Sequence, residues 1–99
     1  MSEQATLVVT AIPNTNDVAS MQEYLQNVMP LLTGAGGSLV KRLKVDQVVQ
    51  GTPAGMVMVM DFDSADAVTA LFDSDDYAAL IPARDRGFAE MNILVTTGM

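Results

Sequence analysis

The chain has 99 residues, with twelve acidic and five basic side chains, and therefore carries a net charge of −7. Nucleic acids and anionic membranes bind basic surfaces, so we expect neither as a partner. The sequence also lacks cysteine and histidine. It therefore has no disulfides, no thiolate chemistry and no histidine to act as general base or metal ligand.

The length fits a single domain over residues 1–99, because no linker, repeat or low-complexity segment divides it. The N-terminal residues lack the basic and apolar regions of a signal peptide, and no apolar run is long enough to span a bilayer. We therefore expect a cytoplasmic protein.

The first half of the chain predicts a strand, a helix and a second strand. The strand regions are rich in β-branched residues, and apolar residues recur at three- and four-residue steps from Val18 to Leu32. Pro30 should bend or tighten the end of this helix. The predicted elements are a strand over 5–12, a helix capped within 14–16 and stopped by Gly34, Gly36 and Gly37, and a long strand over 38–50 that bends or bulges midway.

The second half predicts a turn, a strand, a helical region and a last strand. Ser64 and Ser74 are each placed to cap a helix, and Asp73 with Ser74 interrupts the helical region. The predicted elements are a turn over 51–55, a strand over 56–62, a helix after Ser64, a further helical piece after Ser74 that ends at Gly87, and a strand over 90–97.

The resulting order is β-α-β-β-α-β, which is typical of the ferredoxin-like fold in the α+β class. Right-handed crossovers place both helical regions on the same face of one four-stranded antiparallel sheet. The other face of the sheet is then left uncovered by helices.

The third predicted strand, MVMVM over residues 56–60, is apolar on both faces. An antiparallel sheet with one solvated face normally alternates apolar and polar residues. We therefore predict that a second copy of the chain covers the open face and that the protein is a homodimer. The alternative is a monomer that tolerates exposed apolar side chains.

The stretch from Phe62 to Phe88 resembles the bacterial domain-of-unknown-function family numbered 1330. The pattern that carries the resemblance is Phe62, Ser64, Ala67, Leu71 with Phe72, Ser74, Tyr77 and Arg84. Tyr24 and Gly36-Gly37 are also similar to the family. Phe72 is a departure, because relatives often carry Trp there.

The resemblance implies a dimeric α+β barrel in which two four-stranded sheets pack face to face. It implies no settled activity. Structural relatives include cofactor-free monooxygenases, lactone isomerases and haem enzymes, which use the cavity between sheet and helices, but shared fold alone does not establish function.

The candidate ligand-binding residues are Arg84, Tyr77, Tyr24 and Arg42. An arginine beside a phenol offers a bidentate donor for a carboxylate or enolate. Alternatively, Arg84 and Arg86 only stabilise the end of a helix or pair with Asp75 or Asp76. Arg42 lies in a basic cluster with Lys41 and Lys44 that could equally be a solvated strand edge.

The acidic runs over 61–66 and 73–76 do not predict a metal site. The first lacks the glycine and the bidentate glutamate of a calcium loop, and the second is explained by a capped helix start. We predict no cofactor.

Three functions remain open: a dimeric module that binds a small anionic or partly apolar molecule, a cofactor-independent enzyme (isomerase, lyase or monooxygenase), and a structural dimer without a ligand. In the enzyme, Tyr77, Asp85 or another carboxylate would have to act as acid and base. A cavity filled by methionine side chains would favour the structural dimer.

Overall fold

The computed structural model describes residues 4–51 and 53–98. The elements, in chain order, are β1 (Ala5–Pro13), α1 (Val18–Gly34), β2 (Ser38–Lys44), β3 (Met56–Phe62), α2 (Ala65–Phe72), α3 (Asp75–Ala78), α4 (Ile81–Gly87) and β4 (Phe88–Thr97). Within these ranges no helix is both long and apolar enough to cross a membrane.

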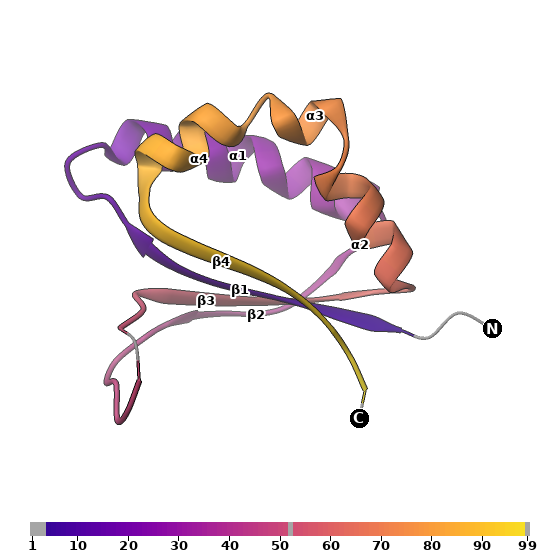
Figure 1. Ribbon diagram of the computed structural model, residues 1–99, viewed down its shortest axis with the longest axis horizontal. Coiled ribbons are helices and arrows are strands. Elements are labelled where there is room, and N and C mark those ends of the chain that lie inside the picture. The colour runs from indigo at the N-terminus through magenta and orange to yellow at the C-terminus, as the bar shows by residue number, and fades with distance from the viewer. Residues whose placement is uncertain (1–3, 52, 99) are drawn as a thin grey trace.

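The four strands form one antiparallel sheet in the order β2-β3-β1-β4. The helices all lie on one side of this sheet (Figure 1). This arrangement confirms the predicted ferredoxin-like α+β fold. β2 and β4 are the two edge strands, so they lie on opposite sides of the molecule.

The core lies between the sheet and the helices. Alternate residues of β1 face the helices and are buried, because side chains of a strand point to opposite faces in turn. In β3 the same alternation buries Met58, Met60 and Phe62. From the helices, the buried apolar side chains are Tyr24, Val28, Leu32, Val68, Leu71, Tyr77 and Ala83.

The opposite face of the sheet, which we call the open face, carries no helix (Figure 1). The register places Val8 between Val59 of β3 and Leu94 of β4 on this face. Val57 lies beside them and is paired with Leu43 of β2. Leu43 and Leu94 are 47% and 50% exposed, so apolar side chains from all four strands meet on the open face, flanked by polar ones such as Lys41, Thr10 and Asn92.

The second strand is shorter than predicted. β2 ends at Lys44. The backbone N–H of Val45 still donates to the carbonyl of Gly55, one step beyond the Lys44–Met56 pair, and residues 46–50 then form no strand. The predicted strand over 45–50 is therefore wrong. The expected irregularity is present, since the pairing register shifts between Leu39 and Lys41.

The first helix begins later than predicted. Asp17 is its N-cap, and its carboxylate accepts hydrogen bonds from the N–H and the hydroxyl of Ser20 at 3.1 and 2.8 Å. The cap expected within residues 14–16 is therefore wrong. At the other end of the helix Ala35 is the C-cap, and Gly36 adopts a positive φ of 94°.

The second helical region is broken into α2, α3 and α4. Ser64 and Ser74 cap α2 and α3 as predicted, by accepting from the N–H groups of Ala67 and Tyr77. α4 ends at Gly87, where it crosses α1. A Cβ on Gly87 would lie 2.5 Å from the backbone nitrogen of Met21, so the crossing requires glycine.

Candidate functional site

Three helices bring one side chain each to a single cluster at the β4 side of the molecule. The hydroxyls of Tyr24 on α1 and Tyr77 on α3 are 2.9 Å apart and share a hydrogen bond. Nη1 of Arg84 on α4 donates to the hydroxyl of Tyr77 at 3.2 Å. Tyr24 and Tyr77 are only 4% and 2% exposed, so Arg84 is the member of the cluster that reaches solvent.

Aromatic neighbours fix the two phenols. The ring of Phe72 meets Tyr77 edge-on at a centroid distance of 4.7 Å, and Phe88 meets Tyr24 edge-on at 5.7 Å. The guanidinium carbon of Arg84 lies 5.9 Å from the centre of the Tyr77 ring, within cation–π range. Arg84 is thus held by both the hydroxyl and the ring of Tyr77.

The positive charge of the cluster is on Arg84. Partial burial lowers the pKa of Arg84, but its hydrogen bonds with Tyr77 and Asp85 outweigh that effect, so the net pKa is raised and the group stays charged. Burial, reinforced by the hydrogen bond with Tyr77, raises the pKa of Tyr24 well above its usual range. Tyr24 is therefore a neutral hydrogen-bonding group at physiological pH.

Arg84 retains free hydrogen-bonding capacity. A guanidinium has five N–H donors. Nε donates to Asp85 at 3.2 Å and Nη1 donates to Tyr77. Within the described part of the chain these are its only hydrogen-bond partners, which leaves three donors for a ligand.

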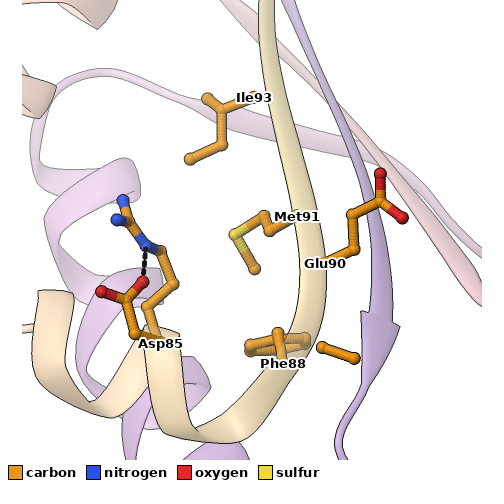
Figure 2. A pocket seen from close by; sticks show the side chains of 7 residues that line it. Asp85, Phe88, Glu90, Met91 and Ile93 are labelled. Atoms are coloured by element: carbon orange, nitrogen blue, oxygen red, sulfur yellow. Dashed lines mark hydrogen bonds and ion pairs between the residues drawn. The ribbon is translucent and has the colours of Figure 1, made fainter.

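Two open hollows flank Arg84. The first has a volume of about 480 Å³, lies between α4 and β4, and is lined by both Arg84 and Asp85. Met91 and Ile93 point from β4 to the side on which Asp85 lies (Figure 2). Glu90 points to the other side of β4 in the same view (Figure 2). The second hollow, about 360 Å³, is lined by Arg84, Ile93, Tyr77 and Phe72 among others. Since both contain Arg84 and Ile93, we call them together the β4 groove.

The interior between the sheet and the helices holds almost no free space. The closed cavity there has a volume of about 20 Å³, which is enough for one water molecule at most. Its walls include Met56, Met58 and Met91, so the interior is filled in the way expected of the structural dimer. In this conformation the room for a ligand therefore lies in the β4 groove.

The structure thus gathers three of the four predicted site residues. Arg42 lies apart, because β2 is the edge strand opposite β4 and its side chain is exposed. Arg86 donates to the hydroxyl of Ser20 and pairs with Glu23. Within the described residues, Arg84 and Arg86 form no ion pair with Asp75 or Asp76.

Sequence reasoning missed the apolar side of the groove. Met91 and Ile93 were assigned only to a last strand. The available signal was the strand alternation, which places Met91 and Ile93 on one face of β4 and Asn92 and Leu94 on the other. Met91 and Ile93 pair with Ala11 and Val9, so their face is the one covered by the helices.

Comparison with known proteins supports the predicted resemblance. The model of a family described as "Domain of unknown function (DUF1330)" matches residues 5–99. No curated protein matches the sequence.

Several solved structures share the fold at low identity. A protein of unknown function from Rhodopseudomonas palustris aligns with a TM-score of 0.82 and 10% identity, over 100% of this chain and 85% of its own. A dimeric ferredoxin-like protein of unknown function from Thermobifida fusca has a TM-score of 0.63 and 13% identity, over 99% and 93%. SnoaB, a cofactor-independent oxygenase from Streptomyces nogalater, has a TM-score of 0.69 and 10% identity, over 99% and 95%.

Proposed function

The chain belongs to the DUF1330 family, and from the geometry of its β4 groove we propose that it is a homodimer that binds a small, anionic and partly apolar molecule beside Arg84. The observation that carries this proposal is the state of Arg84: a charged guanidinium with free donors, held in place by a buried phenol and facing an open groove.

The fixed position of Arg84 favours anion binding. Its side chain is held at Nε by Asp85 and at Nη1 by Tyr77, so little rotational freedom is left to lose when a ligand binds. The remaining donors have the planar geometry that matches a carboxylate or enolate. The groove beside them is lined by the apolar side chains of Met91 and Ile93, which suit the uncharged part of such a molecule.

The open face supports the dimer. Val8, Val57 and Val59 form its centre, and Leu43 and Leu94 extend it to both edges of the sheet. Full burial of side chains of this size stabilises an assembly by about 1.5–3 kcal/mol each. The fold relative from Thermobifida fusca is described as dimeric.

A second candidate function is a cofactor-independent enzyme that acts on the same kind of molecule. The observation in its favour is the hydrogen-bonded chain from Tyr24 through Tyr77 to Arg84, which ends at the groove. In such an enzyme Arg84 would stabilise negative charge that develops on the substrate, and Tyr77 would hold Arg84 in position. The fold relative SnoaB is described as a cofactor-independent oxygenase.

The test compares Arg84→Gln with Arg86→Gln, two variants that remove the same charge from the same helix. Titration calorimetry with benzoate and octanoate measures binding of two carboxylates of different shape. We expect Arg84→Gln to weaken binding about tenfold or more, as expected for a lost charge-assisted hydrogen bond, and Arg86→Gln to leave it within about twofold.

Equal losses in the two variants would mean that only net charge matters and would overturn the role of Arg84. Failure of the wild type to bind either carboxylate, together with a purified dimer free of any retained small molecule in native mass spectrometry, would favour the structural dimer. Consumption of an added ligand by the wild type but not by Arg84→Gln would favour the enzyme.

A further inference from the structure

We propose that Met91 is a movable partition between the β4 groove and the closed interior cavity, and that the ligand is an amphipathic carboxylate whose unbranched apolar tail displaces Met91 and enters that cavity. This inference rests on the proposed function, because it takes Arg84 as the site of the carboxylate. It adds the chemical class of the ligand, and it names Met91 as the residue that controls how long the tail of the ligand can be.

The closed cavity is suited to an apolar guest. It lies between the sheet and the helices, and its walls are aliphatic, aromatic and thioether side chains. The only polar side chain among them is Tyr24, whose hydroxyl is already bonded to Tyr77. A water molecule there would find few hydrogen-bond partners, whereas an alkyl chain needs none.

The wall between the cavity and the groove is one side chain thick. Phe88, Met91 and Ile93 line both the closed cavity and the 480 Å³ hollow. Phe72 and Ile93 likewise line both the closed cavity and the 360 Å³ hollow. Movement of one of these side chains is therefore enough to join the two spaces.

Met91 is the member of this wall that can move. Phe72 and Phe88 are each packed edge-on against a buried tyrosine. Ile93 is β-branched, which restricts its rotation about χ1. Met91 is unbranched, half-buried and in neither aromatic pair, and methionine adapts readily to irregular spaces.

The position of Arg84 sets the orientation of the ligand. Figure 2 shows the side chain of Met91 pointing from β4 to the side on which Asp85 lies, and Asp85 is paired with Arg84. Because Arg84 and Met91 line the same hollow, a carboxylate bound to Arg84 has Met91 within reach of its substituent. The cavity beyond Met91 is further lined by Met56 and Met58, which can rearrange around a chain that the present volume of about 20 Å³ does not admit.

The experiment measures the dissociation constants of acetate, hexanoate, octanoate and octan-1-ol by titration calorimetry. The proteins are the wild type, Met91→Ala, Arg84→Gln and the matched control Met29→Ala. Met29 is also a partly buried methionine packed on the core, but it lies on α1 and lines neither the closed cavity nor the two hollows that form the groove.

We expect affinity to rise about fourfold for each added methylene once the tail reaches the cavity. Octanoate should bind Met91→Ala about tenfold more tightly than the wild type, the gain expected if Met91 leaves the wall about a tenth of the time. Met29→Ala should match the wild type. The affinity for acetate should be the same in the wild type, Met91→Ala and Met29→Ala.

In the wild type itself, octanoate should shift the ¹³C-methyl resonances of Met91 and Met58, and acetate should shift neither. This measurement keeps the test valid if Met91→Ala does not fold.

Carboxylates that bind through Arg84 with an affinity independent of chain length, or equal gains in Met91→Ala and Met29→Ala, would overturn the partition and leave the proposed function intact. Octan-1-ol that binds Met91→Ala as tightly as octanoate, with no effect of Arg84→Gln, would overturn the anion site and leave the cavity. Absence of binding by every probe to every variant would overturn both.

Discussion

Tyr77→Phe should destabilise the protein more than Tyr24→Phe, although each variant loses one phenol oxygen. Among residues 4–51 and 53–98, the hydroxyl of Tyr77 has two partners, Tyr24 and Arg84, whereas the hydroxyl of Tyr24 has only Tyr77. Removal of the Tyr77 hydroxyl therefore leaves the Tyr24 hydroxyl buried without a partner. Removal of the Tyr24 hydroxyl leaves Tyr77 still bonded to Arg84.

The magnitudes follow from burial. An unsatisfied buried hydroxyl costs about 1–3 kcal/mol, so this is the expected loss for Tyr77→Phe. A single hydrogen bond with one partner retained is worth about 0.5–1.5 kcal/mol, the expected loss for Tyr24→Phe. In the Tyr77→Phe background, Tyr24→Phe removes the orphaned hydroxyl. It should therefore cost nothing there or restore some stability.

The assay is a double-mutant cycle by urea unfolding, at one fixed protein concentration because dimerisation would couple stability to concentration. The midpoint of thermal unfolding gives an independent measurement, because it should fall by about 4–8 °C for each kcal/mol of lost stability in a chain of this size. We expect a coupling energy of about 1 kcal/mol or more between the two positions. Additive losses, or a larger loss for Tyr24→Phe than for Tyr77→Phe, would refute the hydrogen-bond geometry of the pair.

Three further predictions concern the helix crossing, alkaline stability and the open face. Gly87→Ala should lower the free energy of unfolding by about 1–3 kcal/mol or more, because its Cβ would meet the backbone of Met21, whereas Gly34→Ala, with open space around it, should be neutral or stabilising in the same urea assay. The pKa of Tyr24 is raised above its usual value of 10.0 in the folded state, so the unfolded chain loses that proton first. Stability is therefore complete below about pH 10 and falls as the pH rises, and Tyr24→Phe should flatten this decline in unfolding measured from pH 8 to 11. Val59→Asp should give a monomer by native mass spectrometry where the wild type is a dimer; a wild-type monomer, or a Val59→Asp dimer of unchanged affinity, would contradict the open-face interface.

The fold was predictable because local patterns determined each element. The β-branched residues of β1 and β3, and the serine caps at Ser64 and Ser74, lie within a few residues of the structure they specify. The end of β2 was not predictable in this way. It depends on where pairing with β3 stops, just beyond Lys44 and Met56, and the β-branched run up to residue 50 does not reveal that.

The site was predictable only in part. Arg84 and Tyr77 are seven residues apart, and their pairing followed from the resemblance to a family pattern. Tyr24 and Tyr77 are 53 residues apart, so their contact depends on how α1 packs against the broken second helical region. Arg42 was included because it is basic, and only the strand order places it at the far edge of the sheet.

The break between α3 and α4 has a consequence for how this protein can vary in length. A continuous helix would separate the Cα atoms of residues 77 and 84 by about 10.5 Å along its axis and present both on nearly the same side. Here the chain turns at Ala79 and Leu80, so the contact depends on the number of residues in that turn. One inserted or deleted residue there would rotate Arg84 away from Tyr77 while the sheet stayed intact. The exposed residues 46–51 after β2, by contrast, can accept added residues, which makes them the place to attach a peptide or a reporter without disturbing the contact between Arg84 and Tyr77.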